Sequence, residues 1–468
     1  MVVLTMLAAF SAPAQTYQEL YGFSAPGGFP PTNTDGAEPY SALILSSNVL
    51  YGTTWEGGSN GVGGIFSVHT DGTQFRDLYS FSALSGGIFG DNSDGGQPYG
   101  ALLLSSNKLY GTTSAGGTSG YGSIFRINTD GSSFTNLHSF TDGLGAPRAG
   151  LIVASNVMYG TTYSGGVDYA GCVFRINPDG SGYNILHSFT GATNDAVGPA
   201  SGLVISGTNL FGTASGGGRY DGGVVFTIST GGIGYTNLFN FETNTDQGNP
   251  STNMTGASPY FGSMILLGNR LYGTTRFGGT NGNGVVFALN TDGSGFTNLH
   301  TFGASSAPGG TNSDGAQPMC QLLLIGSSLY GTTSDGGTND SFGNVFAINT
   351  SGSNFRVIYS FVPIFNNAEI DIGGADPVGG LVLSGNTVYG TTVSGGENAS
   401  GNVYSLDLAI PLAAQRSGGN LVLTWTDSTF GLQAAPTVTG TYTNVPNATS
   451  PFTNTVPASQ QFFRLIGN

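Results

Sequence analysis

Seven copies of an aromatic-Gly-Thr phrase are the feature of this sequence that most constrains its fold. The phrase starts at Tyr51, Tyr110, Tyr159, Phe211, Tyr272, Tyr330 and Tyr389, a spacing of roughly 50 to 60 residues that indicates a tandem repeat. Each copy is followed by Gly-Gly, a Val-Phe-x-Ile-Asn segment, an Asp-Gly step and a Leu-His-Ser-Phe phrase, with local variations. Short β-rich runs at this period are typical of propeller blades, whereas helical repeats would show apolar residues at 3.6-residue spacing.

The second repeat illustrates the strands that we expect in each unit. Four runs are rich in β-branched and aromatic residues and are separated by Gly, Asn, Asp and Ser, as strands usually are. They span Ala101 to Ser105, Lys108 to Thr113, Ser123 to Asn128 and Phe134 to Phe140. The sequence therefore predicts a four-stranded blade, whose strands we call a, b, c and d in chain order.

The two ends of the repeat array predict how it closes. The phrase of strand d first occurs at Leu20–Phe23, before any aromatic-Gly-Thr phrase, and the last unit ends at Leu408 without a strand d. We therefore predict an all-β fold in which residues 15–409 form a seven-bladed β-propeller and the N-terminal strand closes the last blade. Such closure leaves no exposed sheet edge.

The N-terminus has the pattern of an export signal. An apolar run from Val2 to Phe10 precedes Ser11-Ala12-Pro13-Ala14, whose small residues suit signal peptidase. We expect residues 1–14 to be a signal peptide, and Met1 to lie inside a longer leader because a positively charged start is missing. No later run reaches the roughly 18 apolar residues of a membrane span. The expected protein is a secreted or cell-surface monomer.

The tail from residue 410 to 468 has a different pattern. Strands are predicted around Asn420–Trp425, with Trp425 buried, and around Gly440–Val445 and Phe462–Leu465. The tail resembles the small β-sandwich tails of exported bacterial proteins, which implies a small β-sandwich-like domain. Because about 58 residues are near the lower limit for independent stability, we expect this domain to dock on the propeller. By analogy, this domain would serve attachment or sorting.

Comparison among the repeats assigns structural positions to the residues that usually carry chemistry. His138, His187 and His300 occupy strand d positions where other repeats have Tyr79, Phe239 and Tyr359, and His69 replaces an Asn in a turn. The histidines are therefore interpreted as fillers rather than general bases or metal ligands. Cys172 and Cys320 lie in the third and sixth repeats and neither recurs at its repeat position, so no disulfide is expected between blades so far apart. The Asp-Gly steps, such as Asp71-Gly72, are explained as turns.

Acidic residues predominate and gather in the long loops. The chain has 26 acidic and 11 basic residues, for a net charge of −15. In a four-stranded blade the b–c and d–a loops lie on one face, and this acidic face should repel nucleic acid and anionic polymers. We therefore exclude nucleic acid as a partner. Asn-x-Asp-Gly loops offer oxygen ligands of the kind calcium prefers, and the candidate calcium ligands are Asp35, Asp91, Asp94 and Asp314.

The same loop face carries aromatic residues that could stack on sugars. The candidate ligand-binding residues are Trp55, Glu56, Tyr121, Tyr163, Tyr169, Tyr220 and Phe277. They favour a noncatalytic binding or adhesion protein for an extracellular glycan or a cell-surface protein. Two alternatives stay open: a polysaccharide-degrading enzyme that uses paired carboxylates, and a purely structural surface component. No set of residues predicts a catalytic centre, and no cofactor other than calcium is indicated.

Together, the repeated phrases resemble the GloVer-type tandem repeat of choice-of-anchor secreted bacterial proteins. The resemblance spans roughly residues 17 to 410, with Phe211-Gly212-Thr213-Ala214 as a mild departure. It implies an exported, surface-associated protein with a variable C-terminal anchoring segment. The resemblance brings no established activity and no catalytic residues.

Overall fold

The structure is a computed structural model, and every regular element in it is a β-strand. It describes residues 16–86, 90–141, 145–243, 252–305, 311–337, 342–362, 373–408, 413–417, 420–425, 430–437, 441–446, 448–455 and 461–467. The predicted signal peptide, residues 1–14, lies outside this range. Over the described residues the predicted all-β class is confirmed, and none of these residues forms a helix long and apolar enough to cross a membrane.

Seven four-stranded antiparallel sheets, one for each aromatic-Gly-Thr phrase, make up most of the chain. We number them sheets 1 to 7 in chain order. Sheet 1 comprises β2 (Ile44–Ser46), β3 (Val49–Thr54), β4 (Gly64–His69) and β5 (Arg76–Ser80). Sheet 2 comprises β6 (Leu103–Ser105), β7 (Lys108–Thr113), β8 (Ser123–Asn128) and β9 (Thr135–Ser139). Sheet 3 comprises β10 (Ile152–Ala154), β11 (Val157–Thr162), β12 (Cys172–Ile176) and β13 (Asn184–Ser188).

Sheets 4 to 6 repeat the same order of strands. Sheet 4 comprises β15 (Val204–Ser206), β16 (Asn209–Ala214), β18 (Val224–Ser229) and β19 (Thr236–Asn240), and the short pair β14 (Ala196–Val197) and β17 (Gly216–Gly217) lies in its loops. Sheet 5 comprises β20 (Ile265–Leu267), β21 (Arg270–Thr275), β22 (Val285–Asn290) and β23 (Thr297–Thr301). Sheet 6 comprises β24 (Leu323–Ile325), β25 (Ser328–Thr333), β26 (Asn344–Asn349) and β27 (Arg356–Ser360).

Sheet 7 combines the two ends of the repeat array. It comprises β28 (Val382–Ser384), β29 (Thr387–Thr392), β30 (Asn402–Asp407) and the N-terminal strand β1 (Tyr17–Gly22). β1 pairs antiparallel with β30, with Tyr17 opposite Leu406. The first described strand thus supplies the fourth strand that the last repeat lacks.

The predicted strand bounds of the second repeat hold best in the middle of the sheet. β7 and β8 have the predicted bounds, whereas β6 begins two residues later than expected and β9 lacks one residue at each end. The inner and outer strands each have one neighbour, so fewer backbone hydrogen bonds hold their ends.

The glycine of each aromatic-Gly-Thr phrase makes room for a ring on the neighbouring strand. In sheet 3, Gly160 of β11 lies opposite Phe174 of β12. A Cβ atom at Gly160 would come within 2.6 Å of the tip of the Phe174 ring and within 2.8 Å of Leu151. Phe174 is fully buried, so the glycine allows the core of the sheet to fill tightly.

Aromatic stacking joins each sheet to the next. The ring on the fourth strand of one sheet stacks on a ring from the following repeat, and these pairs include Tyr79–Phe134, His138–Tyr183, His187–Tyr235, Phe239–Phe296 and His300–Phe355, with centroids 3.6 to 4.0 Å apart. Tyr359 of sheet 6 stacks on Tyr17 of β1, and Tyr21 of β1 stacks on Phe75 of sheet 1. The prediction that three histidines act as aromatic-sized fillers is therefore confirmed.

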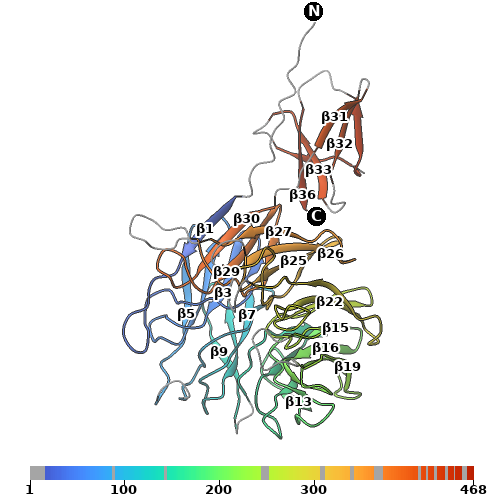
Figure 1. The fold of residues 1–468 in the computed structure, drawn as a ribbon. Helices are drawn as coiled ribbons and strands as arrows, with labels where there is room; N and C mark the ends of the chain where they lie inside the picture. The colour runs from blue at the N-terminus through green and yellow to red at the C-terminus, as the bar shows by residue number, and fades with distance from the viewer. Residues whose placement is uncertain are drawn as a thin grey trace, which may run out of the picture.

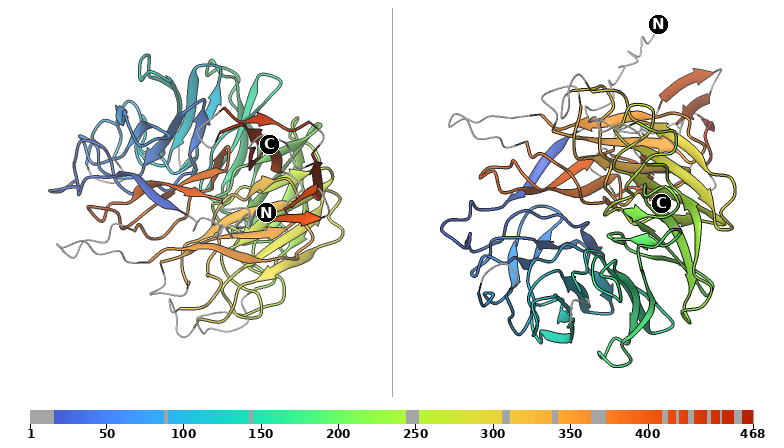
Figure 2. Two further views of the ribbon diagram at one scale, coloured as in Figure 1. Left: turned by 90° about the horizontal axis from the view of Figure 1, so that it is seen from above. Right: turned by 60° about the horizontal axis from the view of Figure 1, so that its bottom comes forward.

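In space the sheets follow one another around the molecule in chain order, in a propeller-like arrangement (Figures 1 and 2). The blue N-terminal elements lie beside the orange elements of sheet 7 in these views. In agreement, β2 of sheet 1 contacts β28 of sheet 7, and β15 of sheet 4 contacts β20 of sheet 5. The shortest strands of neighbouring sheets thus approach one another.

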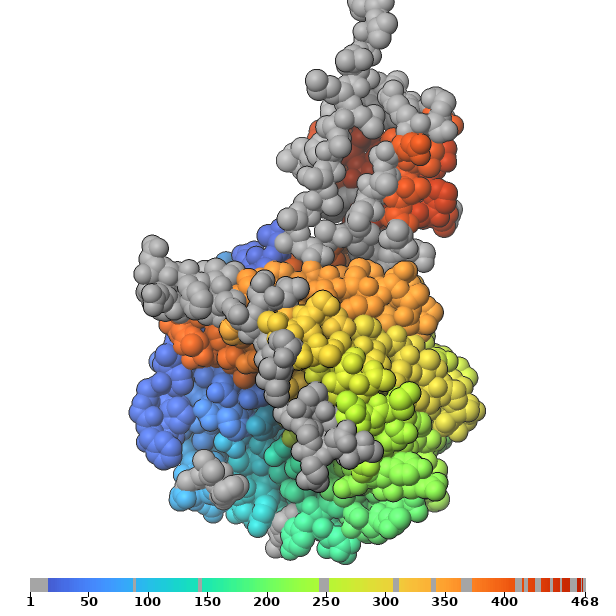
Figure 3. Space-filling view, in the orientation of Figure 1, coloured from blue at the N-terminus to red at the C-terminus, as the bar shows by residue number. Residues whose placement is uncertain are grey.

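The C-terminal residues form two three-stranded sheets beyond sheet 7 (Figures 1 and 3). One comprises β31 (Ala413–Ser417), β32 (Asn420–Thr424) and β35 (Phe452–Thr455), and the other β34 (Thr443–Asn444), β33 (Phe430–Ala435) and β36 (Phe462–Gly467). Trp425 is 5% exposed and belongs to the same apolar cluster as Leu406 and Leu408. Asn386 also donates a hydrogen bond to the carbonyl of Leu465, at 2.8 Å. The tail therefore packs on sheet 7.

Two further expectations concern the cysteines and the Asp-Gly steps. Cys172 and Cys320 are buried and unpaired, as expected. At the Asp-Gly steps the aspartate accepts hydrogen bonds within its own turn, as Asp130 does from the amide and hydroxyl of Ser132 at 2.9 and 2.6 Å. Gly131 has a φ of 86°. These steps are turns, as predicted.

Candidate functional site

A central cavity is lined by residues from all seven repeats. Its volume is about 180 Å³, and its wall consists mainly of the segments that lead into the shortest strands. These segments include residues 40–42, 99–102, 148–152, 202–203, 319 and 378–380. A side chain at the start of such a segment therefore faces the centre of the molecule.

A wider cavity of about 440 Å³ shares much of this wall. We call this wider cavity the mouth. It adjoins the central cavity, with which it shares six lining residues: Tyr40, Tyr99, Arg148, Phe261, Met319 and Val378. Its other lining residues are Tyr260, Arg276, Gln317, Ser334, Asp335, Asp376 and Val393. This volume lies within the usual range for small-molecule sites.

The same backbone arrangement recurs in all seven repeats, six of which supply residues that line the mouth. The residue before each repeat proline adopts a left-handed φ, such as 55° at Glu38 and 53° at Gln317. Its carbonyl accepts a hydrogen bond from the amide of the residue that follows the aromatic-Gly-Thr-Thr segment, as Glu38 does from Trp55 at 3.1 Å. The same bond joins Ala146 to Tyr163, and Gln317 to Ser334. Positions far apart in the repeat thus lie side by side.

The side chains that this arrangement presents differ from repeat to repeat. The residue after the proline is Tyr40, Tyr99, Arg148, Ala200, Tyr260, Met319 and Val378 in sheets 1 to 7. The scaffold positions, by contrast, keep glycine, threonine and phenylalanine. A position that varies while its backbone geometry is constant is free to serve a ligand.

Aromatic rings form one wall of the mouth. Tyr40 packs edge-on against Trp55, with ring centroids 5.9 Å apart, and Tyr99 lies 5.5 Å from Trp55. Tyr99 also stacks on Phe261 at 5.6 Å with an interplanar angle of 15°. The wall is largely apolar. Burial, opposed by the charge of Arg148, raises the pKa of Tyr99 to about 12, so its hydroxyl stays protonated and can donate a hydrogen bond.

Two arginines occupy the same cavity. The guanidinium of Arg148 lies 4.0 Å from the ring centroid of Tyr163 and donates a 2.6 Å hydrogen bond from Nη1 to the Tyr260 hydroxyl. The guanidinium of Arg276 lies 4.7 Å from the centroid of Phe277. Rings and hydrogen bonds thus hold both cations in place.

The carboxyl groups of Asp335 and Asp376 line the mouth, and those of Glu38 and Glu56 act on its lining residue Tyr40. Burial raises the pKa of Glu38, and the nearby charge of Glu56 raises it further. Burial also raises the pKa of Glu56 and of Asp376, although the Asp376 carboxylate accepts a 2.5 Å hydrogen bond from Ser394. The mouth therefore combines aromatic faces, two cations and several hydrogen-bond acceptors.

The structure divides the predicted ligand-binding residues into two groups. Trp55, Tyr163 and Phe277 contact residues that line the mouth, and the charge of Glu56 acts on Tyr40, which lines it. Tyr121 and Tyr169 are 44% and 71% exposed and do not line it. Tyr220 lines a separate cavity beside Glu242 and Met254.

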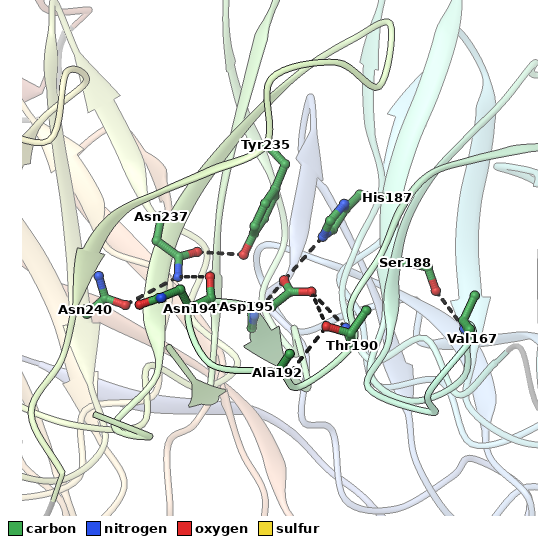
Figure 4. A network of polar contacts seen from close by, with 11 residues as sticks. Val167, His187, Ser188, Thr190, Ala192, Asn194, Asp195, Tyr235, Asn237 and Asn240 are labelled. Carbon is green, nitrogen blue, oxygen red and sulfur yellow. Dashed lines mark hydrogen bonds and ion pairs between the residues drawn. The ribbon is translucent and has the colours of Figure 1, made fainter. Parts of the chain in front are cut away.

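The candidate calcium ligands lie apart in their own repeats. Asp94 Oδ2 accepts hydrogen bonds from the Tyr79 hydroxyl at 2.7 Å and from the Ser82 hydroxyl at 2.9 Å. Asp35 and Asp314 make equivalent contacts with Tyr21 and His300, and Asp91 accepts a hydrogen bond from Ser85. Figure 4 shows this arrangement at another copy, in which Asp195 is held by His187 and Thr190.

These aspartates fasten the d–a loop to the end of the fourth strand. Among the described residues no group of three or more His, Cys, Asp or Glu side chains could hold a metal ion. The buried Oδ1 atoms of Asp35 and Asp94 have no hydrogen-bond partner in the described part of the chain. The calcium hypothesis for Asp35, Asp91, Asp94 and Asp314 stays a prediction.

Sequence reasoning did not select most of the residues that line the mouth. Tyr40, Tyr99, Arg148, Tyr260, Arg276 and Gln317 were absent from the candidate residues. A usable signal was present, because the positions on either side of each repeat proline vary while the proline is kept. Comparing the repeats at these positions would have found the site.

The likeness to one solved structure supports the fold alone. The chain is similar to an oligogalacturonate lyase from Vibrio parahaemolyticus, with a TM-score of 0.50 and 8% identity over 85% of this chain and 97% of that one. A lower score of 0.35, with 13% identity, relates 63% of this chain to 59% of TolB from Acinetobacter baumannii. No curated protein matches the sequence.

The family comparison covers nearly the whole chain. The model of the Gloeobacter/Verrucomicrobia repeat matches three consecutive stretches, residues 12–146, 141–258 and 251–429. These stretches contain all seven aromatic-Gly-Thr phrases. The chain therefore belongs to the Gloeobacter/Verrucomicrobia repeat family.

Proposed function

We propose that this chain is an exported, noncatalytic binding protein that holds an extracellular glycan at the mouth. In this proposal the seven sheets are the blades of a closed β-propeller, and β1 joins the two ends of the ring. Residues 1–14 act as the signal peptide, and residues 410–468 form a small β domain for attachment or sorting. The protein works as a monomer at the cell surface or outside the cell.

One observation carries the proposal. The mouth is a cavity of about 440 Å³ whose walls come from the variable positions of the repeat. Tyr40 and Tyr99 offer ring faces on which a sugar can stack, while Asp376 and Gln317 offer acceptors for its hydroxyl groups. A sugar needs both kinds of contact, because each pyranose ring has an apolar face and a polar rim.

Retention on insoluble polysaccharides tests this proposal. We expect the mature protein to be retained on at least one polymer of a panel, and Tyr40→Ala or Tyr99→Ala to lower the affinity about 2- to 10-fold each, the range for one aromatic contact. Tyr169→Asn is the matched control, since Tyr169 is 71% exposed away from the mouth and Asn tolerates its left-handed φ. Equal loss in the control, or no retention on any polymer, would refute the proposal.

A polysaccharide-degrading enzyme is the second candidate. Glu38 and Glu56 form a neighbouring pair whose pKa values are both raised by burial, and a carboxyl group with a raised pKa can act as a general acid. Assaying the supernatants of the same panel for released sugar tests this candidate. Release that is abolished by Glu38→Gln would replace the binding proposal with this one.

A further inference from the structure

Neither arginine of the mouth forms an ion pair with a described carboxylate, although the chain is strongly acidic; the charge of Asp335 acts on Arg276 only from beyond ion-pair distance. The ion pairs among the described residues are His187–Asp195 and His300–Asp314, and neither involves an arginine. Acidic residues outnumber basic ones by 26 to 11, so arginines without a partner are not a consequence of scarce carboxylates. An unpaired cation inside a cavity is costly unless a ligand neutralises it.

Three tyrosines orient Arg148, and some of its N–H groups donate no hydrogen bond to a described residue. Its guanidinium lies between Tyr163 at 4.0 Å and Tyr99 at 5.7 Å, and Nη1 bonds Tyr260. Nε is buried with no partner in the described structure, and no described residue accepts a hydrogen bond from Nη2. The guanidinium group of Arg148 is thus fixed in place, while its Nε and Nη2 donate no hydrogen bond to a described residue.

Arg276 is fixed in a similar way from the neighbouring sheet. Its Nε donates a 2.9 Å hydrogen bond to Oε1 of Gln317, and Nε2 of Gln317 donates in turn to Asp335 at 3.0 Å. No described residue accepts a hydrogen bond from Nη1 or Nη2 of Arg276. Burial lowers the pKa of Arg276, as expected for a desolvated cation with incomplete compensation.

Tyr260 brings the two guanidinium groups into one site. Its hydroxyl bonds Arg148, and both Arg148 and Arg276 lower its pKa against the larger effect of burial, which raises it. Both arginines line the mouth. Asp335 and Asp376 line the same cavity, so the ligand must present hydroxyl donors as well as a negative charge.

We propose that the mouth recognises an acidic sugar, with the carboxylate of a uronic acid bound between Arg148 and Arg276. This inference rests on the proposed glycan-binding function and specifies the ligand class. Guanidinium groups bind carboxylates through paired, parallel hydrogen bonds. The sugar hydroxyls donate to Asp335 and Asp376, and these acids together with the net charge disfavour densely charged polyanions.

Calorimetric titration with matched trisaccharides tests the inference. The probes are the trisaccharides of galacturonate, glucuronate and mannuronate, each compared with its carboxyl-reduced, neutral counterpart. We expect at least one uronate to bind about tenfold or more tightly than its counterpart. Arg148→Gln and Arg276→Gln should each lower the affinity for that uronate about 10- to 100-fold, the range for hydrogen bonds to a charged group.

The controls separate recognition of charge from loss of the fold. Both variants should bind the neutral counterpart as the parent protein does, and Arg219→Gln should leave uronate binding unchanged, since Arg219 lies over Tyr220 outside the mouth. Arg148→Lys serves as a gentler variant, which keeps the charge and loses the planar fork. Binding of neutral sugars without any preference for uronates would overturn this inference and leave the proposed function standing. Failure to bind any of the six sugars would overturn this inference, and failure on the polysaccharide panel as well would remove the proposed function.

Discussion

Gly160→Ala is the substitution that tests most sharply why the repeat keeps its glycine. The added Cβ would lie 2.6 Å from the Phe174 ring and 2.8 Å from Leu151, distances that force one of these buried side chains to move. Overpacking of a filled core costs about 1–3 kcal/mol. The matched control is Gly231→Ala, at a turn glycine whose nearest neighbour would be 3.7 Å away, and surface changes of this kind stay within about 0.5 kcal/mol.

Urea denaturation gives the free energy of unfolding for each variant, at an unchanged slope. A double variant locates the cause, because Phe174→Leu removes the ring tip that the new methyl group would meet. In that background Gly160→Ala should cost less, with a coupling energy of about 0.5–3 kcal/mol. If Gly160→Ala were as stable as the parent, or if its cost were the same with Leu at position 174, the steric explanation of the repeated phrase would be wrong.

Three further predictions concern stability. Trp425→Ala should destabilise the protein by about 3–5 kcal/mol, as expected for a buried aromatic residue, because Trp425 is 5% exposed in the cluster that joins the tail to sheet 7; an unchanged melt would show that the tail does not dock there. Burial of Asp195 alone would raise its pKa, but hydrogen bonds from Thr190, Ala196 and His187 outweigh this effect and lower it. Asp195 therefore stabilises the folded protein above its pKa in the unfolded chain, about 3.9. This stabilisation is lost as the pH falls through the lower pKa that Asp195 has in the folded protein. The difference in melting temperature between the parent and Asp195→Asn should thus shrink below pH of about 4, and a constant difference would refute the assignment. The calcium hypothesis for Asp35, Asp91, Asp94 and Asp314 predicts a higher melting temperature in calcium than in chelator, and identical melts would end it.

The sequence was sufficient for the repeat and for much of the strand pattern, because strands b and c carry their own signals. The Gly160–Phe174 pair shows why: one strand must be small where its neighbour is large, so both residues recur. The tail was harder to predict, and β31, β33 and β35 were missed. Short strands with weak alternation depend on packing against other elements, which a local pattern does not encode.

The candidate site could be predicted only in part, because it is assembled across repeats. Trp55 and Tyr163 stood out as aromatic residues in loops, and both contact residues that line the mouth. Tyr169 stood out equally and lies on the exposed surface. Arg148 meets Tyr260 across 112 residues of sequence, and no local pattern in either segment encodes that contact.

The most direct test of the account uses the fluorescence of a single tryptophan. The chain has two tryptophans, Trp55 and Trp425, so Trp425→Phe leaves Trp55, which packs against Tyr40 and Tyr99 of the mouth, as the only reporter. We predict a saturable change in Trp55 emission when this variant is titrated with a saccharide that the protein retains, and loss of that change in Tyr99→Ala. Undiminished binding with unchanged Trp55 emission would place the sugar elsewhere and contradict the assignment of the mouth as the binding site.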